Sequence, residues 1–521
     1  MRMPAQIRKP RTARLGSFPA PVAGLIANRS LAFPGAGKLP PGAAVLRNWF
    51  PTASGIVLRR GSMTRVSTGS TKDIRALWSY VNASNERLFA ATDDGIWDVT
   101  TSTAVSSGRT ITSGDWILTQ FATAGGVFLV GVNGADDGWT YDGATFTTIS
   151  LTGVLSKNLA YVWAYKQRLY FVEKNSLNVW YLPVDQIGGT VTKLPLGGVF
   201  AQGGSIVWGH TWSGDSSGDG GLSEQNVFVT SEGEVAVFQG LSPDDAATWG
   251  KVGIYRIGRP LGKRAFIRAG GDLLIATSVG FVSLAEAARR DLAALGAAAV
   301  SYPIEDAWRA AVGTYGTDGW SCETWAEGTM ILVAPPPGIK SPVVYVANSN
   351  TGAWCEFTGW RATALRAWQG RIFFGASAGV VKEAWVGGSD DGAAYVGQFM
   401  PLFDDFGAVA ARKVAQMVRV LWRSALLAAP SVVARFDYDM TFSAPPAGAQ
   451  PSGDNLWGVG QWGVATWGGG GAKKAEDRWF SVGGSGDKIS VAVQFTSGSV
   501  DPADVEIVQV DLSYIAGDIV T

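Results

Sequence analysis

The chain repeats one short pattern: an apolar run, a tight turn that usually contains glycine, and a second apolar run. Its copies are LFAATDDGIWDV from Leu88, VFLVGVNGADDGWTY from Val127, LYFVEKNSLNVWYL from Leu169, VFVTSEGEVAVF from Val227, LLIATSVGFVSL from Leu273, MILVA with VVYVA from Met330, and IFFGASAGVVKEA from Ile372. Successive copies begin 39 to 58 residues apart. A four-stranded propeller blade takes about 40–50 residues, and glycine supplies the positive φ of hairpin turns. The spacing therefore favours a repeat of β-hairpins.

A further apolar or aromatic segment precedes several copies, as in ALWSYV, which ends at Val81, and ALRAWQ, which begins at Ala364. Each repeat then has three or four antiparallel strands. We predict an all-β chain in which residues 73–400 form a β-propeller of six or seven blades. Two longer repeats contain insertions, a Gly/Ser-rich loop at 213–221 and a small helical insertion at 283–312. A pair of β-sandwiches is the alternative fold, because periodicity alone separates the two poorly.

The repeat fades after residue 400, and we predict a C-terminal β-domain over residues 401–521. Its segment 450–471 is rich in Gly and Trp. The indoles recur every five residues, which matches neither a helix nor a strand; they are Trp457, Trp462 and Trp467. Two strand-like runs follow, at 488–495 and 505–514.

Residues 1–72 carry no acidic residue, although the whole chain is neutral, with 43 Lys and Arg against 43 Asp and Glu. They carry twelve basic residues, so residues 73–521 have a net charge of −12. Eight prolines exclude long helices and disfavour central strands here. We predict an extended arm that docks on an acidic partner surface or lies near DNA; a solvated, flexible tail is the alternative. The candidate docking residues are Arg8, Lys9, Arg11, Arg14, Trp49, Phe50, Arg59 and Arg60.

Composition excludes several classes of protein. Zero net charge disfavours a dedicated nucleic-acid binder. The chain has one histidine, His210, and two cysteines, Cys322 and Cys355. These counts exclude a disulfide framework and a Cys/His zinc cluster, and two buried free thiols are favoured over one disulfide. No run of 18 apolar residues predicts a membrane span, and the basic N-terminus lacks the apolar core of a signal peptide.

No catalytic or cofactor-binding motif stands in its required context. No G-x-S-x-G elbow precedes a helix to accompany His210, and the letters G-x-G-x-x-G at 458–463 lack a strand-then-helix setting. Asp215 and Asp219 lack the spacing of an EF-hand loop. The segment 242–249, SPDDAATW, resembles the Asp-box of sialidase-type propellers, which is a structural turn. We predict that the chain is not an enzyme and holds no cofactor and no metal.

Three further stretches follow one another in a distinctive order. They are AAVLRNWFPTASGIVLRRGS at 43–62, the region from TSEGEVAVFQG to PIEDAWRAAV at 230–312, and NTGAWCEFTGWRATALRAWQGRIFFG from Asn350. In this order they resemble the tail nozzle or tail hub protein of short-tailed (podovirus-type) bacteriophages. The resemblance covers most of residues 25–385, and the Trp/Gly-rich segment is similar to the C-terminal region of that family.

The resemblance implies a propeller protomer, six copies of which form a ring that extends and closes the DNA channel and takes part in genome ejection. It implies a tail adaptor protein as partner, tail fibres or spikes and the host envelope as further contacts, and viral DNA in the lumen without sequence-specific binding. It also implies a virion protein of the tail, made in the host cytoplasm. A glycan-binding or glycan-cleaving propeller and a cellular scaffold propeller are the alternative functions.

Overall fold

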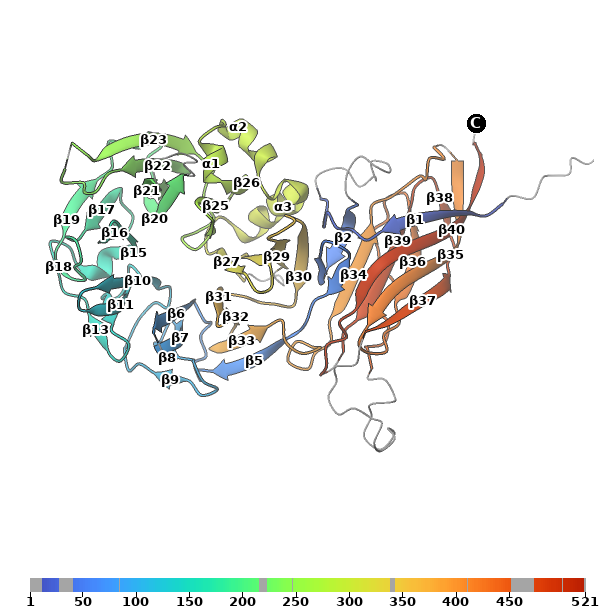
Figure 1. Cartoon of the computed structure of the whole chain (residues 1–521), viewed down its shortest axis with the longest axis horizontal. Helices are drawn as coiled ribbons and strands as arrows, with labels where there is room; N and C mark the ends of the chain where they lie inside the picture. The colour runs from blue at the N-terminus through green and yellow to red at the C-terminus, as the bar shows by residue number, and fades with distance from the viewer. Residues whose placement is uncertain are drawn as a thin grey trace, which may run out of the picture. The chain divides into compact units, whose positions relative to one another are not determined.

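The computed structural model describes residues 12–27, 41–83, 85–214, 223–245, 247–337, 343–409, 411–450, 473–498 and 500–519 (Figure 1). The chain divides into two compact units. The propeller unit comprises Met63–Tyr345 and Gly359–Ala384. The terminal unit comprises Met1–Ser62, Val346–Thr358 and Trp385–Thr521.

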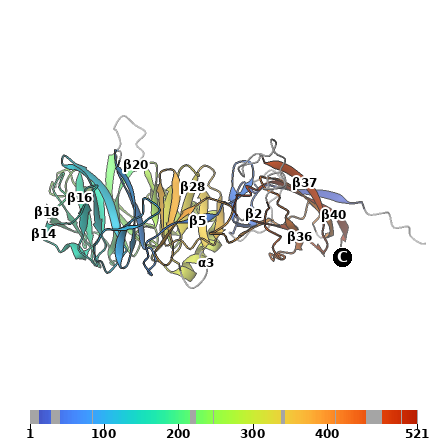
Figure 2. The same ribbon diagram turned by 90° about the horizontal axis from the view of Figure 1, so that it is seen from below.

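Six small sheets of the propeller unit are arranged as the blades of a β-propeller, seen face-on in Figure 1 and edge-on in Figure 2. Their strands are β6 (Ala76–Asn82), β7 (Asn85–Thr92), β8 (Gly95–Asp98) and β9 (Val105–Ser106); β10 (Ile117–Thr123), β11 (Gly126–Val132), β12 (Trp139–Tyr141) and β13 (Phe146–Thr148); β15 (Leu159–Tyr165), β16 (Arg168–Glu173), β17 (Asn178–Tyr181) and β19 (Thr192–Pro195); β20 (Ile206–Gly214), β21 (Ser223–Thr230), β22 (Glu234–Gln239) and β23 (Gly250–Arg256); β24 (Phe266–Ala269), β25 (Asp272–Thr277) and β26 (Gly280–Ser283); and β31 (Ala364–Trp368), β32 (Arg371–Gly375), β33 (Val380–Ala384) and β5 (Ser62–Ser67).

The ring of blades closes through β5, which precedes the first blade in sequence and pairs with β33 of the last. β6, β10, β15 and β20 contact one another in turn, and β31 contacts β6. A hairpin of β27 (Ser321–Trp325) and β28 (Met330–Ala334) occupies a further place in the ring, because β27 contacts both β24 and β31. A separate parallel pair joins β14 (Leu151–Thr152) and β18 (Gly189–Thr190). The prediction of a propeller with six or seven blades is confirmed.

The hairpins follow from the repeated sequence pattern. Most copies of the repeat form the second and third strands of a blade, as β7 and β8 or β21 and β22 do. Gly233 turns the second of these hairpins with φ 82°, a conformation that costs glycine little. Aromatic side chains fill the space between blades, where Trp78 of β6 lies 5.9 Å from Trp139 of the next blade. Both indoles are at most 4% exposed.

The predicted helical insertion is present. It contains α1 (Leu284–Ala287), α2 (Leu292–Leu295) and α3 (Glu305–Tyr315), so it extends three residues beyond the predicted end at 312. Ser283 caps α1 by accepting a hydrogen bond from the amide of Glu286, as the spacing S-x-x-E favours. Short 3-10 turns lie at η1 (Ser156–Asn158), η2 (Gly296–Ala298) and η3 (Tyr302–Ile304). None of the helices in the described part of the chain is long and apolar enough to cross a membrane.

Two sheets make up the terminal unit. One contains β3 (Trp49–Pro51), β4 (Ile56–Leu58), β40 (Glu506–Ile519), β35 (Ala411–Ser424) and β37 (Lys474–Ser481), with β1 (Arg14–Pro19) on β40 and β38 (Ser485–Gly486) on β35. The other contains β30 (Trp354–Thr358), β2 (Ala43–Arg47), β34 (Val396–Pro401), β39 (Ile489–Thr496) and β36 (Ser431–Phe436). The division between the two units falls within β29 (Val343–Asn348).

The core of the terminal unit lies between these sheets. Phe495 of β39 packs edge-on against Trp422 of β35, with ring centroids 5.7 Å apart, and against Trp49 of β3 at 5.8 Å. All residues of β39 are buried, whereas β35 alternates buried and exposed positions over most of its length. The unit is therefore a β-sandwich with one face of its first sheet exposed.

This division differs from the predicted boundaries at 72 and 400. β1 pairs with β40 along its whole length, and β2 pairs with β34, so the two chain ends fold into one unit. The described part of the predicted arm is extended, as expected, but its strands belong to sheets. The two predicted C-terminal strands correspond to β39 and β40.

Candidate functional site

The eight candidate docking residues fall in the first 62 residues of the terminal unit. Arg8, Lys9 and Arg11 lie outside the described residues. Arg14 opens β1 and is exposed, and the strand that carries it is held by β40. Arg14 therefore keeps the exposure that docking on a partner requires.

Trp49 and Phe50 do not have that exposure. They lie in β3 and are only 0% and 5% exposed. Gly397 of β34 comes so close to Trp49 that a Cβ there would lie 2.8 Å from the indole nitrogen. The prediction that these two side chains dock on a partner is wrong for this conformation. Burial in the sandwich removes their large apolar area from water, which is favourable by about 25 cal/mol per Å².

Arg59 is the centre of a buried polar network. Its Nη2 donates to Asp390 Oδ2 at 2.7 Å and to the carbonyl of Thr358 at 2.9 Å, and its Nε donates to Asn48 Oδ1 at 2.8 Å. The guanidinium lies 3.7 Å from the ring centroid of Tyr395, whose hydroxyl donates to the Arg59 carbonyl. The Arg59 side chain is 0% exposed. The predicted docking role is wrong for this residue also, because its charge is already compensated inside the fold.

Arg60 is the last of the eight. It forms two hydrogen bonds with Asp504, Nε to Oδ1 at 3.0 Å and Nη2 to Oδ2 at 2.9 Å. The hydrogen bond to Asp504 raises the pKa of Arg60 from its ordinary value. Its side chain is 42% exposed, so a partner could reach it only in competition with Asp504.

Two of the three stretches that carry the resemblance meet in this network. Asn48 belongs to the first stretch, and its Nδ2 donates to Oγ1 of Thr358 in the third stretch, at 2.8 Å. Beside it, Arg47 forms an ion pair with Glu356 at 2.9 Å. Segments about 300 residues apart in sequence are thus joined by specific polar contacts. These residues build the fold, and they contact one another instead of facing an open site.

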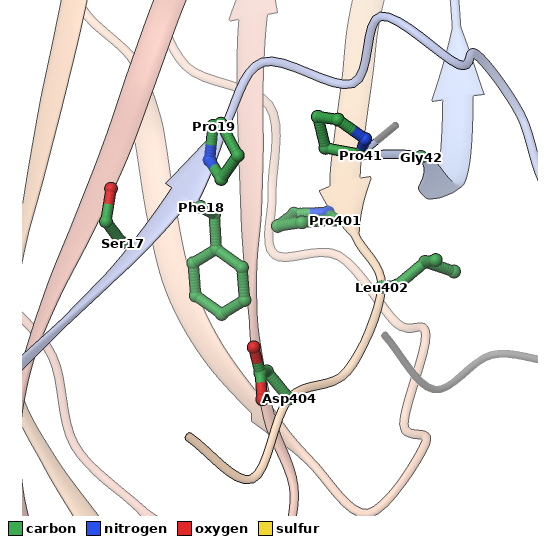
Figure 3. Close-up of a pocket in the computed structure, with 8 residues that line it drawn as sticks. All are labelled: Ser17, Phe18, Pro19, Pro41, Gly42, Pro401, Leu402 and Asp404. Atoms are coloured by element: carbon green, nitrogen blue, oxygen red, sulfur yellow. The ribbon is translucent and has the colours of Figure 1, made fainter. Parts of the chain in front are cut away.

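β1 is anchored beside a small crevice of 10 Å³, room for about one water molecule (Figure 3). Its lining residues are Ser17, Phe18, Pro19, Pro41, Gly42, Pro401, Leu402 and Asp404. Phe18 is 5% exposed and packs edge-on against Phe406 at 5.2 Å. Burial raises the pKa of Asp404, which lies at one end of the crevice in Figure 3. The crevice is too small for a ligand, but it shows how β1 is held.

The single histidine and the two cysteines have structural surroundings. His210 Nδ1 lies 2.9 Å from the carbonyl of Thr211, and its ring packs edge-on against Phe266. Burial lowers the pKa of His210. Cys322 and Cys355 are free and buried, as predicted, and burial raises the pKa of each thiol.

The remaining motifs lie in turns or outside the described residues. Of this motif, residues 242–245 and 247–249 are described and lie between β22 and β23, where Thr248 donates to Asp245 at 2.7 Å. The loop with Asp215 and Asp219 and the segment with Trp457, Trp462 and Trp467 lie outside the described residues. Among the described residues, no group of three or more His, Cys, Asp or Glu is arranged to hold a metal ion.

A cavity of 160 Å³ lies within the propeller unit, and we call it the mouth cavity. Its lining residues are Arg75, Asp115, Lys263, Arg264, Asp318, Gly319, Trp320, Pro336, Pro337 and Thr363. Several stand directly before the first strand of a blade, as Arg75 does before β6 and Thr363 before β31. Because the first strands surround the propeller axis, these residues meet near one end of it. Sequence reasoning missed the site, since its members come from six separate loops.

Ion pairs organise the wall of the mouth cavity. Lys263 Nζ lies 2.7 Å from Asp115 Oδ2, and Arg264 Nη2 lies 2.6 Å from Asp115 Oδ1. Burial opposes ionisation of Asp115, but Arg264 and Lys263 outweigh it and lower the pKa of the carboxyl. Burial lowers the pKa of Lys263, and the carboxylate of Asp115 partly offsets this effect.

A wider groove of 420 Å³ lies between β23 and the turn that joins α1 and α2. It contains Arg256, Arg289 and Arg290. The last two share one carboxylate, that of Glu286, in ion pairs at 3.6 and 2.7 Å.

No family model and no curated protein sequence matches this chain. Solved propellers resemble it in fold. The WD40 propeller domain of Doa1 matches with a TM-score of 0.37 and 8% identity over 62% of this chain and 97% of that one. Sqt1 of Saccharomyces cerevisiae matches with a TM-score of 0.35 and 11% identity over 62% and 98%. The extracellular domain of a one-component system from B. thetaiotaomicron matches with a TM-score of 0.41 and 8% identity over 76% and 58%. Similarity at this level carries no argument about function.

Proposed function

We propose that the chain is a structural protein of a phage tail, of the nozzle or hub class, without enzymatic activity. In this role it extends and closes the DNA channel and takes part in genome ejection. Six copies form a ring, a tail adaptor protein holds the ring, and DNA passes through without sequence-specific contacts. The protein is made in the host cytoplasm and resides in the virion, where tail fibres or spikes and the host envelope are further contacts.

The observation that supports this proposal most strongly is the network around Arg59. The first and third stretches of the resemblance supply Asn48, Arg59 and Thr358 to this network, and Asp390 completes it. The first stretch and the start of the third therefore help to build the terminal unit, as expected for a protein whose role is structural. A residue pattern shared for catalysis would instead leave its polar groups accessible to a substrate.

The N-terminus supports the proposed contact with the adaptor. The segment before residue 12 carries Arg2, Arg8, Lys9 and Arg11 and no acidic residue. It leads into β1, where Arg14 is exposed and the backbone is held by β40. A basic segment whose C-terminal end is held by a paired strand can bind an acidic surface on a neighbouring protein.

Composition of purified virions tests the proposal. Quantitative mass spectrometry of the phage that encodes the chain should find it at six copies per particle. Its absence from particles with intact tails would contradict the structural role. In that case, binding of the purified protein to a glycan array would favour the alternative glycan-binding propeller.

A further inference from the structure

We infer that the mouth cavity binds a small ligand through an oxyanion group, either a carboxylate or a phosphate. The inference concerns the propeller unit alone and does not depend on the proposed tail function. It rests on the hydrogen-bonding capacity, the charge and the size of the cavity.

The cavity has more hydrogen-bond donors than acceptors. Both carboxylate oxygens of Asp115 are already engaged, one by Lys263 and one by Arg264. Arg264 Nη2 also donates to the carbonyl of Trp116 at 2.9 Å, but Nε and Nη1 of Arg264 have no partner among the described residues. A guanidinium has five N–H donors and no acceptor, so most of its capacity is unused here.

Two further side chains add to this surplus. The hydroxyl of Thr363 is buried and has no hydrogen-bond partner within the described ranges. A buried polar atom without a hydrogen-bond partner destabilises the fold unless a bound molecule supplies the partner. Arg75 is 52% exposed in its side chain, and its ion pair with Asp93 is long at 3.5 Å. Arg75 could donate to a bound oxygen without breaking a strong contact, and Thr363 could do so once its side chain turns the enclosed hydroxyl toward the cavity.

The charges favour an anion over a cation. Three cationic side chains line the cavity, Arg75, Lys263 and Arg264, against the two carboxylates of Asp115 and Asp318. One oxygen of Asp318 accepts a hydrogen bond from the amide of Gly319 at 2.8 Å. The lining therefore has a net charge of +1, and its unused groups are mainly N–H and O–H donors, which match the oxygens of a carboxylate or phosphate.

The size and the remaining walls limit the ligand. A cavity of 160 Å³ is close to the engineered cavity of about 150 Å³ that holds a benzene molecule, so about six non-hydrogen atoms fit. Trp320, Pro336 and Pro337 supply apolar walls on which a short carbon chain could pack. An inorganic phosphate and a short carboxylate such as butyrate both satisfy these limits.

Isothermal titration calorimetry on the full chain tests the inference, with inorganic phosphate and with butyrate as separate probes at constant ionic strength. Saturable binding at one site per chain is expected for one or both. Binding of phosphate alone assigns the site to phosphate, and binding of butyrate alone assigns it to carboxylates. Binding of neither probe would overturn the inference.

Two substitutions locate the binding. Arg75→Gln should weaken it about tenfold or more, and Thr363→Val by about two- to tenfold, because each removes one donor to the oxyanion. Neither residue is part of the Asp115 ion pairs, so both variants should fold. Arg371→Gln is the matched control, since Arg371 is 50% exposed and pairs with Glu383 away from the cavity lining. Equal affinity of all three variants and the original protein would contradict the location.

Discussion

The substitution Asp390→Asn tests the role of the Arg59 network most sharply. It removes the counter-charge of a guanidinium that is 0% exposed, while the size and shape of the side chain stay nearly the same. Loss of one partner from a buried ion pair costs about 3–5 kcal/mol. Asp390 is 14% exposed and the amide oxygen still accepts one hydrogen bond, so we expect a loss of about 3 kcal/mol in the free energy of unfolding.

The terminal unit has about 200 residues, for which 1 kcal/mol shifts the melting temperature by about 2–4 °C. Asp390→Asn should thus lower the melting temperature of this unit by about 6–12 °C in differential scanning calorimetry. Hydrogen exchange of the amides in β2 and β34 should accelerate, because the terminal unit opens more often when it is less stable. This readout separates the terminal unit from the propeller unit.

Asp477→Asn is the matched control. Asp477 forms an ion pair with Arg419 on the surface of the same unit, and its side chain is 51% exposed. Exposed ion pairs contribute little, so this substitution should leave the melting temperature nearly unchanged. Equal shifts for the two variants would refute the reasoning, since burial would then make no difference to the charge pair.

Three further predictions concern the N-terminal segment, the histidine and the two cysteines. Removal of residues 1–11 should leave the melting temperature unchanged but reduce incorporation into tails, measured by immunoblot of purified particles; full incorporation would exclude a docking arm. Burial lowers the pKa of His210, so the unfolded chain binds the extra proton first and stability should fall as the pH drops below about 6.5. His210→Gln should flatten this part of a melting-temperature profile between pH 5 and 8, and parallel profiles would contradict the assignment. Cys322 and Cys355 are 7% and 0% exposed, so neither thiol should react with Ellman's reagent before unfolding, and both should react in guanidinium; reaction of the folded protein would show that the burial is wrong.

The propeller could be predicted from the sequence because its contacts are local. Each hairpin, such as β7 with β8, joins residues a few positions apart, and glycine marks the turn. The helical insertion had an equally local signal in the capping residues Ser283 and Glu286. Short-range patterns of this kind can be recognised in the sequence without knowledge of the long-range contacts.

The terminal unit could not be predicted in the same way, because its pairings join distant segments. Arg14 lies opposite Tyr514, and Arg59 pairs with Asp390, 331 positions away. A basic and apolar segment without acidic neighbours resembles a docking arm when its folded-state partners lie far away in the sequence. The partners are Asp390 and Asp504, and no spacing rule connects them to Arg59 and Arg60.

Immunogold electron microscopy of purified particles tests the central claim most directly. An antibody raised against the purified chain would be applied to virions of the phage that encodes it, with tails lacking the chain as the control. We predict that the gold label concentrates at the distal end of the tail. Intact tails without label, under conditions in which the antibody recognises the purified protein, would contradict the claim that this chain is a tail nozzle or hub.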